Sequence, residues 1–411
     1  MKIVMVSASD IEGGAARAAY RQHRAFINEN LDSLMLVQNK SIDDNSVLGP
    51  NSAAERYYLK IRPKLDTIPV RFYKNRLRVL FSPAFLPFSR IVKKINEINP
   101  DIVHLQWINQ GMIRIEDILK IKVPIVWTLQ DMWAFTGGCH YCENCLSYER
   151  NCGNCMILGS NKKKDLSRSV FKRKQNTFAK MNNLTIVCTS RWLENCAKAS
   201  CLLSNKKITC LPNSLDTNLF KPFDKEKARE LWGLPKNIKL VLFGAIEAIS
   251  DNRKGFKELS EALKKIKGKD IEVVVFGSSK PKSLPDFGFK THYLGYLHDD
   301  ISIVTLYSAC DVMVVPSLQE AFGQTASESL ACGTPVVAFG NTGLSDIISH
   351  KLNGYLVAPF DTSELAEGIE WILRNTHYKK LSENARQMAA TTFDSKIVAR
   401  KYINLFNNLI H

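Results

Sequence analysis

Short apolar runs alternate along this chain with longer segments that have the apolar spacing of helices, and this alternation constrains the fold most strongly. It predicts parallel sheets built from strand-helix-strand units, and therefore an α/β protein. The strands expected in the first half are 2–8, 33–37, 101–107, 124–129, 184–190 and 207–212. Those expected in the second half are 239–245, 271–277, 291–296, 311–315, 335–339 and 354–357, followed by helices near 363–375, 378–391 and 395–409.

Length and composition set the class of protein. The chain has 411 residues, enough for two or three domains with separate cores. It contains no apolar run of the roughly 18 residues that a membrane-spanning helix needs. Its first residues are predicted to form a strand rather than a signal peptide, so we expect a cytoplasmic protein. Its eleven cysteines are then expected to be thiols or metal ligands rather than disulfides.

The net charge of +16 is concentrated in two segments of the first half. Residues 56–94 hold eleven Lys and Arg against the single acid Asp66, which gives this segment a charge of +10. Residues 162–180 hold eight against Asp165, a charge of +7. The rest of the chain is therefore close to neutral.

Aromatic side chains are interleaved with the first basic segment, among them Tyr57, Phe72, Phe85 and Phe88. Basic helices with an apolar face dock on anionic bilayers, so an anionic membrane surface is one expected partner. A solvated basic face without a partner is the main alternative. Nucleic acid attracts the same charge through its phosphates, but it is the least favoured of the three and no nucleic acid is expected as a partner.

The stretch from 316 to 335 carries the most specific chemistry in the sequence. Glu320 and Glu328 lie eight residues apart on either side of a Phe-Gly step, between the expected strand 311–315 and the start of a helix. A glycine lets a ligand approach the backbone closely, and the N–H groups at the start of a helix bind anions. The amides expected to bind a phosphate are those of Phe322, Gly323, Gln324 and Thr325.

This pattern, with the Cys-Gly-Thr-Pro that ends at Pro335, resembles the E-x7-E signature of the family 4 retaining glycosyltransferases, which have the GT-B fold. The resemblance implies two Rossmann-like domains that face a central cleft. It implies an acceptor-side domain in residues 1–213, with a Cys-rich loop at 137–158, and a nucleotide-sugar-binding domain in residues 214–394. In resembling proteins the last helix, here 395–411, crosses back to the first domain.

The resemblance also implies roles for residues of the second half. Glu320 would bind hydroxyls of the transferred sugar and Glu328 the nucleotide ribose, tasks that suit ionised carboxylates. Arg253 and Lys254 would hold the diphosphate of a nucleoside diphosphate sugar and neutralise the charge that grows on it as the sugar departs. The arginine of the family more often stands at the position of Ala245, so Arg253 is expected to replace it from beside the lysine.

Two further groups of residues are candidates for substrate binding. The strand ends at Phe276-Gly277-Ser278 and Tyr296-Leu297 would form a slot for the nucleobase, with a place in the core as the equal alternative. Gly13 and Gly14 follow the first strand and resemble the N-terminal Gly-Gly loop of the family, and a tight structural turn is the alternative. Their spacing is not the G-x-G-x-x-G of dinucleotide-binding proteins.

The run from Thr128 to Trp133 is similar to a bacterial surface-polysaccharide branch of the family, whose usual run is Thr-Leu-His-Asp-Met-Trp. The histidine, which touches the donor sugar in relatives, is replaced by Gln130, which exchanges hydrogen bonds but takes up no proton at neutral pH. Retention still needs no dedicated base if the leaving phosphate receives the proton of the acceptor. Asp131 would assist the acceptor, with helix capping as the equal alternative.

Five cysteines crowd residues 139–155. Four of them match the pattern of that branch and suit a closed tetrahedral site for structural zinc, which would pin an acceptor-side loop. Free or paired thiols are the alternative, and an iron–sulfur cluster is a third. No catalytic metal is expected. The proposed zinc ligands are Cys139, Cys145, Cys152 and Cys155.

Together these features predict a retaining glycosyltransferase. It would move a hexose-type sugar from a nucleoside diphosphate donor to a lipid-linked glycan during assembly of a bacterial surface polysaccharide, such as lipopolysaccharide or capsule. It would work in the cytoplasm, at the inner face of the cell membrane if the basic segment docks there. One alternative is a GT-B protein that lost turnover with Gln130 and binds a nucleotide or a partner. The other is a nucleic-acid-binding protein.

Overall fold

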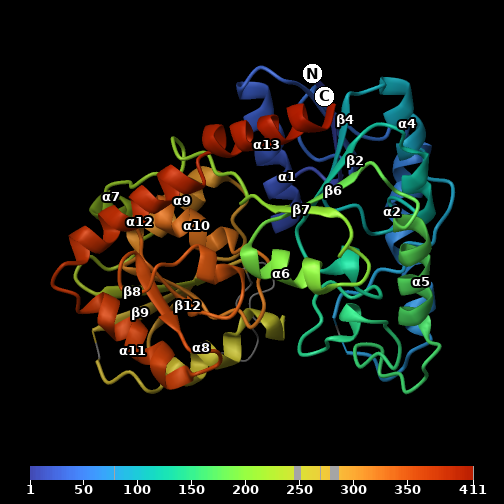
Figure 1. Ribbon diagram of the computed structural model, residues 1–411. Helices are drawn as coiled ribbons and strands as arrows, with labels where there is room; N and C mark the ends of the chain where they lie inside the picture. The colour runs from blue at the N-terminus through green and yellow to red at the C-terminus, as the bar shows by residue number, and fades with distance from the viewer. Residues whose placement is uncertain (78, 245–250, 269, 278–286, 411) are drawn as a thin grey trace. The chain divides into compact units, whose positions relative to one another are not determined.

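The chain forms two compact units, each with its own parallel sheet (Figure 1). The computed structural model describes residues 1–77, 79–244, 251–268, 270–277 and 287–410. Unit 1 comprises Met1–Pro212 and Ala399–His411, and unit 2 comprises Asn213–Val398. The predicted fold class, α/β with two Rossmann-like domains, is therefore confirmed.

The described part of unit 1 contains a seven-stranded sheet in the order β3-β2-β1-β4-β5-β6-β7, in which every pairing is parallel. Its central strands are apolar along their whole length because both faces of a parallel sheet are covered. The strands are β1 Lys2–Ser9, β2 Asp32–Asn39, β3 Val47–Leu48, β4 Ile102–Leu105, β5 Ile125–Leu129, β6 Leu184–Cys188 and β7 Lys207–Cys210. Six of them are the strands expected from the sequence. The edge strand β3 was not predicted, because two residues are too few to give a pattern.

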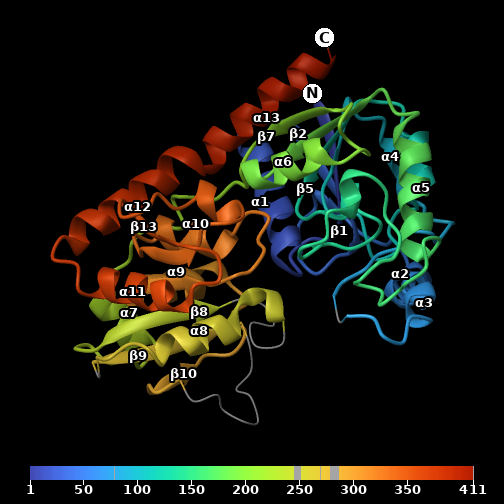
Figure 2. The same ribbon diagram turned by 60° about the horizontal axis from the view of Figure 1, so that its bottom comes forward.

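Helices connect these strands and cover the sheet of unit 1 (Figure 2). The basic segment 56–94 contributes to three of them, α2, α3 and α4, rather than forming one continuous helix. The helices are α1 Gly14–Asn28, α2 Ala53–Asp66, α3 Ile68–Arg71, α4 Ile91–Ile98, α5 Leu166–Phe178 and α6 Arg191–Ala199, with short 3-10 turns at Ile115–Lys120, Trp133–Phe135 and Ser147–Glu149.

The final helix, α13 (Ser395–Ile410), belongs to unit 1 from Ala399 onward, and its end lies beside α1 (Figures 1 and 2). Phe406 packs edge-on against Phe26, with ring centroids 5.4 Å apart. The Tyr402 hydroxyl lies 3.0 Å from Oγ1 of Thr128 on β5. These contacts join the last residues of the chain to the core of its first half.

Unit 2 has a six-stranded parallel sheet in its described residues, in the order β10-β9-β8-β11-β12-β13. Successive residues of β8 point to opposite faces, so that Leu240 and Leu242 enter one apolar cluster and Val241 and Phe243 the other. The strands are β8 Lys239–Gly244, β9 Ile271–Phe276, β10 Thr291–Tyr293, β11 Val312–Val315, β12 Val336–Phe339 and β13 Gly354–Val357. The helices are α7 Lys225–Leu231, α8 Phe256–Leu263, α9 Asp300–Ala309, α10 Gln324–Ala331, α11 Thr362–Leu373 and α12 Tyr378–Thr392, with 3-10 turns at Asn252–Lys254 and Gly343–Asp346.

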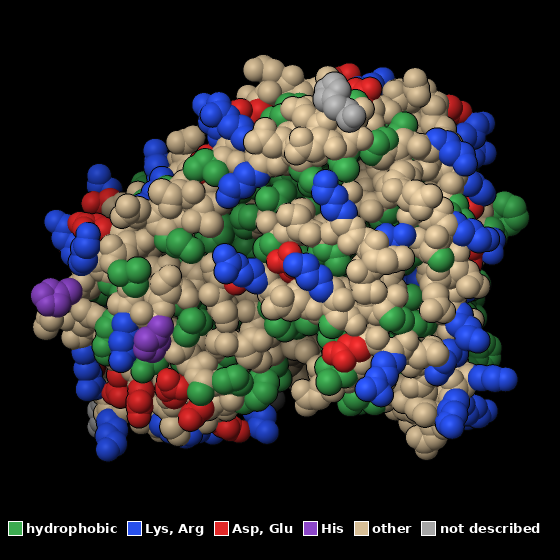
Figure 3. Space-filling view, in the orientation of Figure 1, with side chains coloured by type: hydrophobic (Ala, Val, Ile, Leu, Met, Phe, Trp, Pro, Cys, Tyr) green, Lys and Arg blue, Asp and Glu red, His purple; other side chains and the backbone are tan. Residues whose placement is uncertain are grey.

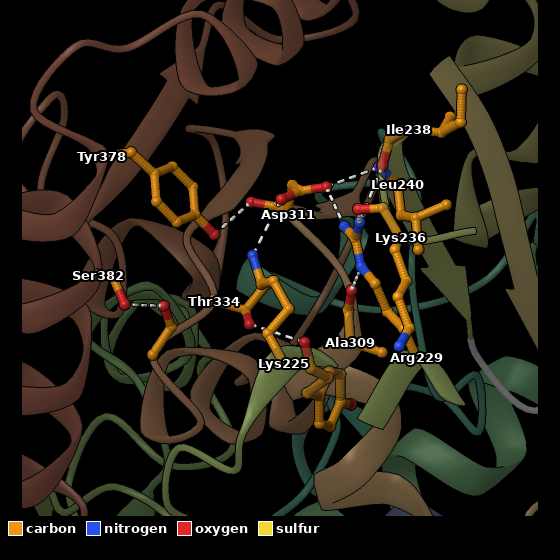
Figure 4. Close-up of polar contacts among 12 residues, drawn as sticks. Lys225, Arg229, Lys236, Ile238, Leu240, Ala309, Asp311, Thr334, Tyr378 and Ser382 are labelled. Atoms are coloured by element: carbon orange, nitrogen blue, oxygen red, sulfur yellow. Dashed lines mark hydrogen bonds and ion pairs between the residues drawn. The ribbon is translucent and has the colours of Figure 1, made fainter. Parts of the chain in front are cut away.

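A buried ionic cluster at the start of β11 ties the elements of unit 2 together (Figure 4). The carboxylate of Asp311 lies 2.9 Å from Nζ of Lys225 and 2.8 Å from Nη2 of Arg229, and it also accepts the N–H of Leu240. Burial would raise the pKa of Asp311, but the two cations and the hydrogen bonds hold it below its ordinary value. Tyr378 donates to the carbonyl of Asp311 at 2.9 Å. Every charge in the cluster has a partner within the protein, which indicates a structural role.

Candidate functional site

Two loops of unit 2 meet where the sequence predicts a donor site. The loop after β11 reaches α10 through Gly323, whose φ of +107° favours glycine and whose added Cβ would lie 2.5 Å from the Leu344 side chain. The other loop contains Gly255, where a Cβ would lie 1.8 Å from the carbonyl oxygen of Pro316. Leu318 donates its N–H to the carbonyl of Arg253 at 2.8 Å. Backbone contact therefore fixes the residues around 253–255 against those around 316–323.

This contact brings three of the predicted site residues together. Lys254 Nζ lies 2.8 Å from Oε2 of Glu320, and Arg253 Nη1 lies 3.7 Å from the same oxygen. Arg253 is held by Asp251, at 2.9 Å, and by the carbonyl of Gln319. Burial would raise the pKa of Glu320, but the charges of Lys254 and Arg253 hold it below its ordinary value. The result is a half-buried cluster of two cations and an ionised carboxylate.

The start of α10 lies directly after this cluster in the chain. The helix begins at Gln324, with Gly323 before it and buried Phe322 packed edge-on against Phe393. The N–H groups of Gln324 and Thr325 belong to the first turn, which carries the positive end of the helix dipole. The structure thus places the Phe-Gly step and the basic pair on neighbouring loops of the same unit, an arrangement suited to an anionic ligand.

Glu328 lies one turn further into α10 and is buried. The Tyr307 hydroxyl donates to Oε2 of Glu328 at 3.0 Å. Tyr307 comes from α9, and its ring packs edge-on against Phe276 at 6.0 Å. Tyr307 is a contact that the sequence analysis missed, because a tyrosine in an apolar helix gives no signal of its partner.

The other predicted donor residues are placed as follows. Tyr296 is nearly half exposed, whereas Phe276 is buried in the core of unit 2. Ser278 and Ala245 lie outside the described residues. In unit 1, Gly13 caps α1 with a φ of +93°, and no atom would lie within 4 Å of an added Cβ. Gly14 is the first residue of that helix.

A second polar cluster lies in unit 1, at the end of β5. Gln130 donates to Oε1 of Gln106 at 3.1 Å, and Gln106 in turn contacts Nε2 of buried His104 at 3.1 Å. The His104 Nε2 also lies 2.8 Å from the hydroxyl of Thr128. Gln130 is therefore one end of a chain of polar side chains that enters the core.

Asp131, next to Gln130, is enclosed by donors. Its Oδ2 accepts from Nε1 of Trp107 at 2.8 Å and contacts Nδ1 of His140 at 2.6 Å. Its Oδ1 accepts the N–H of Trp133 at 2.8 Å, two residues further along, although the residue that caps the 3-10 turn Trp133–Phe135 is Met132. Burial would raise the pKa of Asp131, but His140 and the hydrogen bonds hold it below its ordinary value. His140 and Trp107 were not recognised from the sequence.

The cysteine-rich segment does not form a recognisable metal centre. Among the residues that the structure describes, no group of three or more His, Cys, Asp or Glu side chains is placed to hold a metal ion. Cys139 and Cys152 are buried, and Cys145 and Cys155 are partly buried. Burial raises the pKa of Cys139 to about 12, which keeps its thiol protonated. The arrangement does not support the zinc site, and zinc stays a prediction that metal analysis of the purified protein can test.

Part of the basic charge in unit 1 proves to be structural. The guanidinium of Arg62 is buried and donates to the carbonyls of Gly111, Leu86 and Pro87. Lys174 is also buried, with Nζ 3.6 Å from the ring centroid of Trp133, and burial lowers its pKa to about 7. These two charges, counted from the sequence as part of a basic face, are not available to a partner.

Other basic residues meet at the surface of unit 1. Lys74 of the first basic segment and Lys162 and Lys164 of the second line one open cavity of about 730 Å³, together with Phe72, whose side chain is 81% exposed. Leu166 donates its N–H to the Tyr73 hydroxyl at 2.9 Å and so joins the two segments. Figure 3 shows Lys and Arg gathered along the side of unit 1 that carries α4 and α5. None of the helices in the described ranges is long and apolar enough to cross a bilayer.

Comparison with protein families gives a match in unit 2. The profile of the family described as "Glycosyl transferases group 1" matches residues 224–388, which include the Lys254, Glu320 and Glu328 positions. A curated relative from Campylobacter jejuni, N,N'-diacetylbacillosaminyl-diphospho-undecaprenol alpha-1,3-N-acetylgalactosaminyltransferase, is 30% identical over 51% of this chain and 56% of its own. The chain spans about half the length of the curated relatives it matches.

Solved structures extend the likeness to the whole chain. Sucrose-phosphate synthase from Thermosynechococcus elongatus superposes with a TM-score of 0.72 at 18% identity, over 100% of this chain and 99% of its own. Anabaena Alr3699/HepE, solved with UDP and glucose, gives a TM-score of 0.66 at 18% identity over 99% and 100%. At such identities the likeness shows the fold alone. That fold is GT-B, as the sequence resemblance implied.

Proposed function

We propose that this chain is a retaining glycosyltransferase. It transfers a hexose-type sugar from a nucleoside diphosphate sugar to a lipid-linked glycan acceptor during assembly of a bacterial surface polysaccharide. The observation that carries the proposal is the cluster of Lys254, Arg253 and Glu320 beside the start of α10. The family match of unit 2 supports the reaction class. The named substrate of the Campylobacter relative supports a lipid-linked acceptor.

On the donor side, the cations and the helix start bind the diphosphate. Lys254 and Arg253 stabilise the charge that develops on the leaving phosphate, which is the largest electrostatic demand of the reaction. The amides of Phe322, Gly323, Gln324 and Thr325 add donors of the kind that helix starts offer to phosphates. Once a diphosphate takes up the cations, Glu320 accepts hydroxyls of the sugar.

The nucleoside part of the donor has a separate set of residues. Glu328, held by Tyr307, accepts the hydroxyls of the ribose. Tyr296 offers an exposed ring for the nucleobase. In unit 1, Gly13 and Gly14 bind a phosphate or sugar close to the start of α1, where an added Cβ at Gly13 would meet no atom within 4 Å.

On the acceptor side, Asp131 orients the attacking hydroxyl and Gln130 hydrogen-bonds the donor sugar. Because the neutral amide of Gln130 takes up no proton, the proton of the acceptor passes to the departing phosphate oxygen. The bond from the sugar carbon to that oxygen breaks as the bond to the acceptor oxygen forms on the same face. No metal takes part in this proposal.

The basic surface of unit 1 is proposed to bind the membrane. Lys74, Lys162 and Lys164 surround a cavity with the exposed ring of Phe72, a combination of charge and apolar surface that suits an anionic bilayer. We propose that this surface holds the protein at the inner face of the membrane, where a lipid-linked acceptor resides.

Gln130 favours one alternative, a protein that binds the nucleotide without turnover. A thermal-shift screen with nucleoside diphosphates and their sugars, followed by a transfer assay with the sugar nucleotides that bind, separates the two. Ligand binding to the folded protein raises its melting temperature. Stabilisation with transfer supports the enzyme, and stabilisation without transfer to any acceptor supports the binding protein. Absence of stabilisation by every nucleotide contradicts both.

A further inference from the structure

Unit 1 contains a serine, a histidine and an aspartate in series. His140 Nε2 lies 2.8 Å from Ser82 Oγ, and His140 Nδ1 lies 2.6 Å from Asp131 Oδ2. This is the order of groups in a serine-nucleophile triad, but the exposure is reversed. Ser82 is 3% exposed and His140 2%, whereas Asp131 is 9% exposed. A nucleophile must reach its substrate, so Ser82 does not act as one, and the carboxylate of Asp131 is the least buried of the three groups.

The backbone holds the serine and the histidine in place. The segment around Phe81 pairs antiparallel with that around Cys139, so that Ser82 donates its N–H to the carbonyl of Gly138 at 2.8 Å. Gly138 has a φ of +123°, and an added Cβ would lie 2.6 Å from the ring of Phe81, so only glycine fits. This pairing connects two segments that are 58 residues apart in the sequence.

Two tryptophans hold the imidazole ring. The Trp133 ring stacks with His140 at a centroid distance of 6.4 Å and an interplanar angle of 27°, and the Trp107 ring lies at 5.4 Å and 38°. Among the described residues, the charged groups near His140 are Asp131 itself and, beyond Trp133, the buried Lys174 of α5. The ring therefore has little freedom to turn away from Asp131.

The hydrogen bonds that Asp131 already accepts determine how many more its carboxylate can accept. An ionised carboxylate accepts about four hydrogen bonds. Oδ2 receives two, from His140 and Trp107, and Oδ1 receives one, from the N–H of Trp133. Because a carboxylate only accepts, Nδ1 of His140 must carry a proton, and the Ser82 hydroxyl can either donate to Nε2 or accept from it. Among the residues that the structure describes, no further donor reaches Asp131, so one of the four positions, on Oδ1, is not used by them.

We infer that His140 is a positioning residue that orients Asp131 so that its Oδ1 accepts a single hydroxyl of the sugar acceptor. The inference rests on the proposed function, and it assigns the specificity for that hydroxyl to a buried side chain that does not touch the substrate. Trp107 supplies the second donor to Oδ2, and Ser82 keeps the imidazole in place. The ligand class, a sugar hydroxyl, follows from the proposed function, and a carboxylate oxygen accepts the hydrogen bond of such an O–H group.

Two variants separate the hydrogen bond from the packing. His140→Phe keeps a ring and removes the donor, whereas His140→Asn keeps an N–H donor near the position of Nδ1. In His140→Phe the acceptor kcat/KM should fall at least ~10-fold, the scale of one lost charge-assisted hydrogen bond, and the donor KM should not change. His140→Asn should recover most of the loss. The control is His23→Asn, which changes another buried histidine of unit 1, held by Ser33 and Ser46.

If folded His140→Phe keeps the wild-type acceptor kcat/KM, or if His140→Asn is as impaired as His140→Phe, the inference is overturned. If the wild-type protein transfers no sugar, the proposed function fails instead. In that case ¹⁵N NMR of the wild-type histidines still tests the arrangement, because His140 should be protonated at Nδ1 and its signal should move in Asp131→Asn. Protonation at Nε2 alone would overturn the inference without any activity measurement.

Discussion

Lys254 Nζ lies 2.8 Å from Glu320 Oε2, so the lysine proposed to bind the diphosphate and the glutamate proposed to bind the sugar neutralise each other. In the proposed function, a diphosphate bound here competes with the carboxylate for the N–H groups of Lys254. We therefore expect nucleotide binding to weaken the Lys254–Glu320 pair and to leave Glu320 to the hydroxyls of the sugar.

Replacing the cation should impair the chemistry. For Lys254→Ala we expect the kcat/KM for the donor to fall at least ~100-fold, the scale of a lost group that stabilises transition-state charge. Lys257→Ala, which changes an exposed lysine one turn further along, is the matched control. Steady-state kinetics with the donor that passes the thermal-shift screen measures both. Equal rates for the two variants would show that Lys254 is not part of the donor site.

Glu320→Gln should change binding and transfer in opposite directions. Without the carboxylate, Lys254 and Arg253 attract a free nucleoside diphosphate more strongly, since no anion has to be displaced. Transfer should fall, because the sugar loses an ionised acceptor. Calorimetric titration with the nucleoside diphosphate and a transfer assay give the two quantities. Weaker diphosphate binding in this variant would contradict the displacement of Glu320.

Breaking the ionic cluster of unit 2 should unfold that unit more easily. Asp311→Asn leaves Arg229 buried without its counter-charge, and removing one partner of a buried pair costs about 3–5 kcal/mol. Glu230→Gln, which loosens an exposed pair with Lys236 at 3.7 Å, should change stability by less than about 1 kcal/mol. Denaturant titration measures both. Similar midpoints for the two variants would show that the cluster contributes little.

Acid should destabilise unit 1 through His104. Burial lowers the pKa of this histidine to about 3 from an ordinary value near 6.5, so the folded protein holds it neutral. The unfolded chain takes up the proton first, and stability should fall by about 1.4 kcal/mol per pH unit as the pH drops from 6.5 towards 3. Buried His23, with its pKa lowered to about 4, adds to the slope over the upper part of this range.

Substitution isolates the contribution of His104. Urea titrations between pH 7 and pH 4.5 should show a shallower pH dependence for His104→Gln than for the wild type. His377→Gln, which changes an exposed histidine of unit 2, should leave the wild-type slope unchanged. An unchanged slope in His104→Gln would mean that the imidazole is charged in the folded protein.

The basic cavity of unit 1 should bind anionic vesicles. We expect flotation with liposomes that contain anionic lipid, none with neutral ones, and release by salt as the Debye length falls from about 30 Å at 0.01 M to about 3 Å at 1 M. The combined change of Lys74, Lys162 and Lys164 to Gln should abolish flotation. Three exposed lysines of unit 2, Lys257, Lys379 and Lys380, provide the control. Equal recovery of both triple variants would show that these lysines of unit 1 form a solvated basic face that does not bind the membrane.

The sequence predicted the strands and the donor loops because each is encoded locally. Apolar runs mark β8 and β11, and the Phe-Gly step marks the start of α10. Contacts between residues that are far apart in the sequence could not be predicted. Ser82 meets His140 across 58 residues and Tyr307 meets Glu328 across 21, and neither pair shares a local pattern. The charge count wrongly assigned Arg62 and Lys174 to a basic surface for the same reason. Both are buried and donate to carbonyl oxygens, whose positions the sequence does not reveal.

The return of α13 to unit 1 has a consequence for synthesis on the ribosome. A nascent chain emerges from its first residue onward, and domains usually fold in that order. Phe26 and Thr128 emerge early, but Tyr402 and Phe406, which pack on them, emerge after all of unit 2. Of the two units, unit 1 is thus translated ahead of unit 2 but completed after it, and until α13 is made Phe26 lacks the rings of Tyr402 and Phe406 that cover it.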